Sequence, residues 1–219
     1  MIPVAIAGIL ALSWSPASAL SASDTMRDFF RQAVAVIKDP RTEAHPQEAL
    51  RKIRAMADTL FDVREAAPAA LGPHWAARSP AEQEEFTRLF GHLVEQAYLT
   101  WVASLIGGQR IQFKFGDETR HGTAALVKTT IQAKDGRSVP LDYRMSMRQG
   151  RWTVRDVVVD NVSLLDNYRA QFKYVLASAP YSTLIATMRA KTAEGVPVSA
   201  GTTRPETSAM GRDVWSQAP

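Results

Sequence analysis

The stretch from Val139 to Phe172 constrains the fold most, because it predicts two strands, a tight turn and a helix in immediate succession. Its first nine residues, VPLDYRMSM, alternate apolar and polar side chains, which is the period of a strand with one buried face. After Gln149-Gly150 the chain returns through a valine-rich run into NVSLLDNYRAQF, which has the pattern of an amphipathic helix. A sheet face of Met, Tyr and Val followed at once by such a helix can enclose a long apolar ligand.

Three helices are predicted before this stretch. The first begins at Asp24 and ends at Asp39-Pro40, and the second spans roughly residues 46–63. The third begins at Ser79-Pro80-Ala81-Glu82, a capping box with proline at the first helical position. Its wide apolar face, which Gly107-Gly108 ends, predicts that this helix is a main wall of the core.

Four strands are expected to follow as a meander, which is typical of an antiparallel sheet. The first alternates around residues 111–115, the second spans about 123–133, and residues 134–137 form the hairpin turn to the third. The fourth runs over residues 151–159, and helices at 163–178 and 181–193 close the domain. This order of elements predicts an α+β fold with a four-stranded antiparallel sheet between N-terminal and C-terminal helices.

The two ends of the chain differ from the middle. Residues 2–12 form an apolar run, and the small residues 17–19 follow at the spacing that a signal peptidase accepts, so we expect a secretory signal cleaved after Ala19. The alternative, a buried N-terminal helix, is disfavoured by Pro3, Gly8 and Pro16. Residues 194–219 are rich in Thr, Ser, Pro, Gly and Ala and predict a disordered tail. One domain over residues 20–193 is therefore expected, exported, soluble and without a membrane anchor.

Composition excludes several kinds of site. There is no cysteine, so no disulfide, thiolate nucleophile or cysteine-ligated metal can form. The 26 basic and 22 acidic residues give a formal charge of +4, and the basic residues are too dispersed to predict nucleic-acid binding. No His-x-x-x-His or carboxylate-rich spacing indicates a metal site.

Five motifs, in order along the chain, resemble those of the MlaC family of periplasmic phospholipid carriers. They are LGPHW (71–75), SPAEQEEFTRLF (79–90), DYR (142–144), GRWTVRDVVVDNVSLLDNYRAQF (150–172) and LIATMRAK (184–191). The resemblance covers about residues 24–193. One departure is Asn161, where many relatives carry glycine, and asparagine tolerates the same left-handed turn.

The resemblance implies a curved sheet and helices that enclose a cavity for phospholipid acyl chains. It also implies a monomeric carrier that moves lipid between an outer-membrane lipoprotein complex and an inner-membrane ABC transporter complex. Members associated with hopanoid metabolism leave a hopanoid-type lipid open as the ligand. A carrier of this kind needs no catalytic residue and no cofactor.

The side chains expected to line the cavity are apolar and come from the sheet and from two helices. They are Phe113, Phe115, Tyr143, Met145, Met147, Val157 and Val159 from the sheet, with Tyr98, Trp101, Leu105, Leu164, Tyr168 and Phe172 from the helices. Each of these, taken alone, has the pattern of an ordinary core residue. Arg144 and Arg169 are candidates for a lipid phosphate, and a surface ion pair is the competing explanation for both.

Two other functions compete with lipid carriage. Small cone-shaped enzymes of the NTF2-like kind share this layout and use a carboxylate in a pocket. Asp156, which interrupts an apolar strand, would be that carboxylate, although we expect it to be a structural aspartate with satisfied hydrogen bonds. An adaptor that only docks onto membrane complexes would show exposed apolar patches and no internal cavity.

Overall fold

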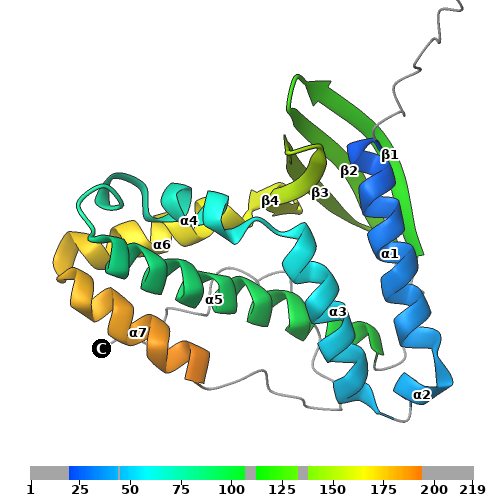
Figure 1. Cartoon of the computed structure of the whole chain (residues 1–219), viewed down its shortest axis with the longest axis horizontal. Coiled ribbons are helices and arrows are strands. Elements are labelled where there is room, and N and C mark those ends of the chain that lie inside the picture. The colour runs from blue at the N-terminus through cyan, green and yellow to red at the C-terminus, as the bar shows by residue number, and fades with distance from the viewer. Residues whose placement is uncertain (1–19, 44, 107–111, 133–137, 194–219) are drawn as a thin grey trace, which may run out of the picture.

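The computed structural model describes residues 20–43, 45–106, 112–132 and 138–193 and has the expected α+β fold (Figure 1). The expected signal, the tail and the turn at 134–137 lie outside the described residues. In chain order the elements are α1 (Ala22–Lys38), α2 (Pro40–Glu43), α3 (Pro46–Leu60), α4 (Val63–Leu71), the 3-10 helix η1 (Gly72–His74), α5 (Pro80–Ile106), β1 (Gln112–His121), β2 (Ala124–Gln132), β3 (Ser138–Arg148), β4 (Arg151–Val159), β5 (Val162–Ser163), α6 (Leu164–Ser178) and α7 (Tyr181–Ala193). No helix within these ranges is long and apolar enough to cross a membrane.

The sheet is an antiparallel meander in the order β1-β2-β3-β4-β5, with one more strand than the sequence predicts. The added strand, β5, has two residues and pairs with the end of β4, Val159 opposite Val162. Asp160 and Asn161 make the turn with φ of 48° and 64°, the positive values that a two-residue type I′ hairpin requires. The left-handed conformation expected for Asn161 is confirmed.

Two β-bulges interrupt the regular pairing and bend the strands. In β1 the register against β2 shifts between Phe115 and Glu118. Between β3 and β4 it shifts after the Arg144–Asp156 pair, so that Met145 lies opposite Val154 and Arg155 is the extra residue. A bulge bends its strand and increases the local twist, which curves this sheet.

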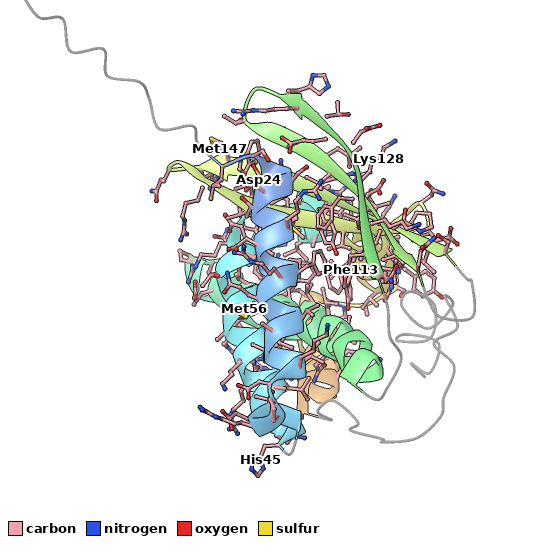
Figure 2. All side chains as sticks on the ribbon, turned by 90° about the vertical axis from the view of Figure 1, so that its right-hand side faces the viewer. Asp24, His45, Met56, Phe113, Lys128 and Met147 are labelled. Carbon is pink, nitrogen blue, oxygen red and sulfur yellow. The ribbon has the colours of Figure 1, made fainter. Side chains whose placement is uncertain are left out.

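The first of two hydrophobic clusters, which we call the sheet core, joins α1 and α3 to one face of the sheet (Figures 1 and 2). Alternation along β2 and β3 puts Val127, Tyr143 and Met145 on this face, where each is at most 4% exposed. Phe30 of α1 stacks on Phe113 of β1 with 4.0 Å between ring centroids. This face of the sheet is therefore covered by α1.

The second cluster, the helical core, lies among α4, α5, α6 and α7. Phe86, Phe90 and Phe172 are fully buried there, and the rings of Phe86 and Phe172 meet edge to face at 5.4 Å. The predicted capping box starts α5: the Glu82 amide donates to Ser79 Oγ at 3.3 Å, and the Ser79 amide donates to Glu82 Oε2 at 2.8 Å. In Figure 1 the helical core lies at one end of the molecule, and the sheet with α1 lies at the other.

A short connection between α3 and α4 joins the two ends. The predicted second helix runs to Val63 in one piece, but the structure ends it at Leu60 and starts α4 at Val63. Phe61 forms an isolated parallel bridge with Val154, and the Asp62 amide donates to the Val154 carbonyl at 3.1 Å. The Asp62 carboxylate then accepts from the Glu65 amide at 3.0 Å and caps the new helix. The pairing with β4 thus interrupts the helix that the apolar spacing predicts over residues 46–63.

Candidate functional site

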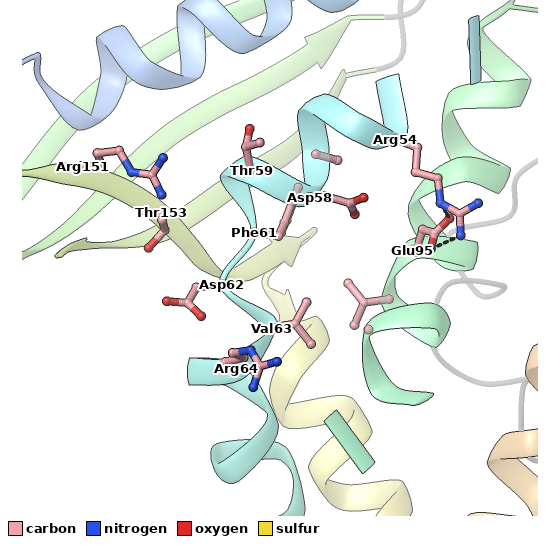
Figure 3. Close-up of a pocket in the computed structure, with 13 residues that line it drawn as sticks. Arg54, Asp58, Thr59, Phe61, Asp62, Val63, Arg64, Glu95, Arg151 and Thr153 are labelled. Atoms are coloured by element: carbon pink, nitrogen blue, oxygen red, sulfur yellow. Dashed lines mark hydrogen bonds and ion pairs between the residues drawn. The ribbon is translucent and has the colours of Figure 1, made fainter. Parts of the chain in front are cut away.

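A cavity of about 550 Å³ lies where the sheet end and the helical end meet, between α3, α4, α5 and the start of β4 (Figure 3). Its size is within the range of pockets that hold organic ligands, about 300–1,000 Å³. It is lined by Arg54, Ala57, Asp58, Thr59, Phe61, Asp62, Val63, Arg64, Gly91, Val94, Glu95, Arg151 and Thr153. Its apolar members come from α3, the α3–α4 connection, α4 and α5, and six of the other lining residues are charged.

Two of the three arginines that line the cavity are neutralised by carboxylates. Arg54 of α3 forms a two-pronged pair with Glu95 of α5, with Nη2 to Oε2 at 2.6 Å and Nε to Oε1 at 2.5 Å (Figure 3). Arg64 pairs with Glu84 through two contacts of 3.0 Å. The Arg151 side chain has no hydrogen bond or ion pair to any residue in the described part of the chain. The Arg54–Glu95 pair holds α3 against α5 beside the cavity.

A second, smaller void of about 30 Å³ adjoins the first and shares Phe61, Asp62, Val63 and Val94 with it. It extends between β4, α4, α5 and α6 towards the helical core. Its other lining residues are Ala66, Phe90, Val154, Arg155, Asp156, Val157, Leu164 and Leu165. Two residues that the sequence analysis proposed, Val157 and Leu164, are among them.

The seven sheet residues proposed as cavity lining lie together, but on the face of the sheet that α1 covers. Tyr143 and Met145 are buried in the sheet core, and Phe113, Phe115, Met147, Val157 and Val159 are partly buried at its margin. None of the seven is among the described residues that line the large cavity. The reason is strand alternation, which turns Arg151 and Thr153 towards the cavity and Trp152 and Val154 towards α1. Their contact with lipid stays a prediction.

The proposed helix residues also belong mainly to a packed core. Tyr168 and Phe172 are 5% and 0% exposed in the helical core, and Leu164 lies at its margin. Burial raises the pKa of the Tyr168 hydroxyl to about 12. The side chains of Tyr98, Trp101 and Leu105 lie outside the described residues, although the α5 backbone includes these positions.

Both arginines proposed for a phosphate are paired with carboxylates. Arg144 Nη1 lies 3.0 Å from Asp156 Oδ2 and 3.7 Å from Asp166 Oδ2. Arg169 contacts Asp166 at 3.0 Å and donates from Nε to the Ala69 carbonyl at 2.7 Å. Neither arginine is among the described residues that line the large cavity, so their geometry fits the competing explanation, a surface ion pair.

Asp156 has the geometry of the structural aspartate that we expect from the sequence. It is 5% exposed, and its Oδ2 accepts from Ser163 Oγ at 2.7 Å and from Arg144 Nη1 at 3.0 Å. Its Oδ1 accepts from the Leu165 amide at 3.0 Å, at the start of α6. Both oxygens are therefore engaged in fastening α6 and β3 to β4.

The cavity residues that the sequence analysis did not single out lie mainly on α3, on the start of α4 and on α5. Phe61 has the spacing of a helical stripe, so its position at a helix break is visible only in the structure. Gly91 is the residue whose sequence context gives a signal, because glycine weakens a helix interior and its presence there indicates a packing reason.

Comparison with known proteins identifies the family of this chain. A family model described as MlaC protein matches residues 27–190, from the first turns of α1 into the last turn of α7. The chain belongs to the MlaC family. The resemblance predicted from the five motifs is thus confirmed, and the match includes every element that lines the cavity.

Two known proteins are similar to this MlaC-family chain, one in sequence and one in structure. The intermembrane phospholipid transport system binding protein MlaC of Haemophilus influenzae is 27% identical over 122 residues, which are 54% of this chain and 56% of that protein. The aligned part thus spans about half the length of this relative. The phospholipid-binding protein from Ralstonia solanacearum, solved in complex with a phospholipid, superposes with a TM-score of 0.69 at 19% identity, over 80% of this chain and 98% of that one. At this identity the likeness establishes the fold.

Proposed function

We propose that this MlaC-family chain is a periplasmic lipid carrier that holds phospholipid acyl chains in its cavity. It would shuttle lipid between an outer-membrane lipoprotein complex and an inner-membrane ABC transporter complex. The observation that carries the proposal is the cavity of about 550 Å³ at the junction of sheet and helices, in a fold whose Ralstonia neighbour was solved with a phospholipid bound.

The volume of the cavity matches about one acyl chain. A methylene occupies nearly the same volume as a water molecule, roughly 30 Å³. The cavity of about 550 Å³ therefore holds about 18 methylenes. Burying each methylene contributes about 0.8 kcal/mol, so a chain that the protein covered on every side would gain at most roughly 14 kcal/mol relative to water.

The second chain of a phospholipid requires more room than this cavity gives. We place it at the margin of the sheet core, where Phe113, Phe115, Met147, Val157 and Val159 are only partly buried. Partly exposed apolar side chains gain contacts when hydrocarbon covers them, and methionine adapts to chains of different shape. A shift of α1 away from the sheet would extend this surface to Tyr143 and Met145, which are buried beneath α1 and α3.

Carriage of this kind needs no catalytic group. A chain gains nearly the same free energy in an apolar pocket as in a bilayer, so transfer between them is close to neutral. The direction of transport would then be set by the membrane complexes. The engagement of both Asp156 oxygens supports carriage over an enzyme that uses this carboxylate as a base.

Mass spectrometry of organic extracts tests the proposal. The full chain is purified from the periplasm of a producing bacterium without detergent, and extracted lipid is quantified per protein chain. We expect about one phospholipid per chain. A polycyclic lipid in its place would identify a hopanoid-type ligand. Protein that carries no lipid, and takes up none from phospholipid vesicles, would overturn the proposal.

A further inference from the structure

The large cavity and the small void are separated by a thin apolar partition. Phe61, Val63 and Val94 line both spaces, so their side chains lie between them. The fourth shared residue, Asp62, directs its carboxylate to the amide of Glu65 at the start of α4. The partition therefore consists of three apolar side chains: Phe61 from the α3–α4 connection, Val63 from α4 and Val94 from α5.

The small void is suited to hydrocarbon. Beyond the partition its wall includes Ala66, Phe90 and Leu164, and it leads into the helical core. Besides Asp62, the charged residues at the void are Asp156, which accepts three hydrogen bonds, and Arg155, which pairs with Glu65 at 3.0 Å. Apolar groups that fill such a void gain van der Waals contacts with its walls.

Val63 occupies its place because α5 has no side chain opposite it. A Cβ atom built on Gly91 would lie 3.2 Å from Val63 Cγ1, closer than ordinary van der Waals contact. Glycine weakens a helix interior relative to alanine, so its presence in α5 has a cost that this close approach explains. Gly91 thus lets Val63 stand between the two spaces.

We infer that the small void is the inner end of the acyl-chain site, and that Val63 limits how long a chain the site accepts. The inference rests on the proposed function and deepens it. A chain that fills the large cavity would end against Val63. Beyond it the void offers room for about one more methylene, at roughly 30 Å³ each.

Removing the two methyl groups of Val63 should join the two spaces. With the existing void, Val63→Ala would then admit about two to three more methylenes at roughly 30 Å³ each. Each buried methylene is worth a factor of about four in binding. The variant should therefore favour chains two carbons longer by about 15-fold over wild type.

The test uses delipidated full-length protein and mixed vesicles of phosphatidylglycerols that differ only in chain length, two carbons at a time. Protein is separated from the vesicles, and mass spectrometry gives the chain lengths retained. Adding Ala66→Leu to Val63→Ala refills the joined space from the helical side and should restore the wild-type preference. Val175→Ala is the matched control, because it also removes two methyl groups and Val175 packs beside the helical core. Val175 is not among the described residues that line either space, so this variant should leave the chain-length preference unchanged.

The outcomes separate this inference from the function on which it rests. If wild type and Val63→Ala both load lipid with the same chain-length preference, the inference is wrong and carriage stands. If Val175→Ala lengthens the preferred chain as much as Val63→Ala does, the effect is general loosening and the inference is again wrong. Wild-type protein that loads no phosphatidylglycerol of any length would overturn the proposed function and the inference together.

Discussion

Replacing Asp156 by asparagine should lower stability without removing lipid binding. The aspartate joins three elements, because it accepts hydrogen bonds from Arg144 on β3, from Ser163 and from the Leu165 amide at the start of α6. An asparagine keeps one acceptor oxygen for the amide of Leu165. Its amide group then faces the guanidinium of Arg144, so that two donors meet where donor and acceptor met before.

The magnitude follows from the charge and the burial of these contacts. A hydrogen bond to a charged group contributes about 1.5–3 kcal/mol, and Arg144 is half exposed, so water compensates part of its loss. We expect Asp156→Asn to cost about 2 kcal/mol. For a domain of this size that corresponds to a fall in Tm of roughly 4–8 °C. Truncation to alanine also leaves the Leu165 amide without its acceptor and should cost about 3 kcal/mol.

Urea unfolding measures this loss, and Asp160→Asn provides a matched control. Asp160 lies in the β4–β5 turn with φ of 48°, a conformation that asparagine adopts readily, and it is exposed. The control should change the free energy of unfolding by less than about 0.5 kcal/mol. Lipid retained per folded chain should be the same in wild type and both variants.

Two results would refute this account of Asp156. Stability within about 0.5 kcal/mol of wild type would mean that the three hydrogen bonds do not fasten α6 to the sheet. Normal stability and lipid content with loss of a measurable turnover would instead identify Asp156 as a catalytic base.

Three further changes test other parts of the structure. Val157→Glu should reduce co-purified lipid per chain at least tenfold, because a carboxylate would face the acyl chain. Val162→Glu is the control, since Val162 is 58% exposed, and should leave the lipid content unchanged. Equal lipid in the two variants would exclude Val157 from the acyl-chain site. Phe113→Ala removes the stacking partner of Phe30 and should destabilise by about 2–3 kcal/mol in urea unfolding; a change under about 0.5 kcal/mol would show that α1 is not held by this contact. Because burial raises the pKa of Tyr168 from 10.0 to about 12, the folded state keeps a proton that the unfolded chain loses. The contribution of Tyr168 to the free energy of unfolding should therefore be fully present below pH 10 and fall by up to about 1.4 kcal/mol per pH unit between pH 10 and 12. Tyr168→Phe should make this fall shallower. An identical pH dependence in the variant would contradict the assignment.

Local signals predicted much of the fold. The capping box at Ser79 starts α5, and the helix predicted over residues 163–178 is α6, which spans Leu164–Ser178. The turn at Asn161 adopts the left-handed conformation that asparagine permits. In each case the residues that determine the structure are neighbours in sequence, so one chain is enough to find them.

Features that depend on distant contacts could not be predicted. The break between α3 and α4 depends on Phe61 pairing with Val154, and β5 has two residues, too few to show a period. The proposed lining residues have the right alternation, but alternation distinguishes the two faces of a strand and not a packed core from a cavity. Which face the cavity adjoins is decided by how the α3–α4 connection pairs with β4 and by the place of α5 across the cavity.

The central claim, that an acyl chain lies in the cavity between sheet and helices, is tested most directly by photocrosslinking. The full chain is loaded with a phospholipid that carries a photoreactive group near the methyl end of one chain, irradiated and mapped by peptide mass spectrometry. We expect labels on the α3–α4 connection at Phe61 and Val63 and on α5 at Val94, suppressed by excess unlabelled lipid. Labels confined to exposed sites such as Tyr174, or unaffected by competing lipid, would contradict the account.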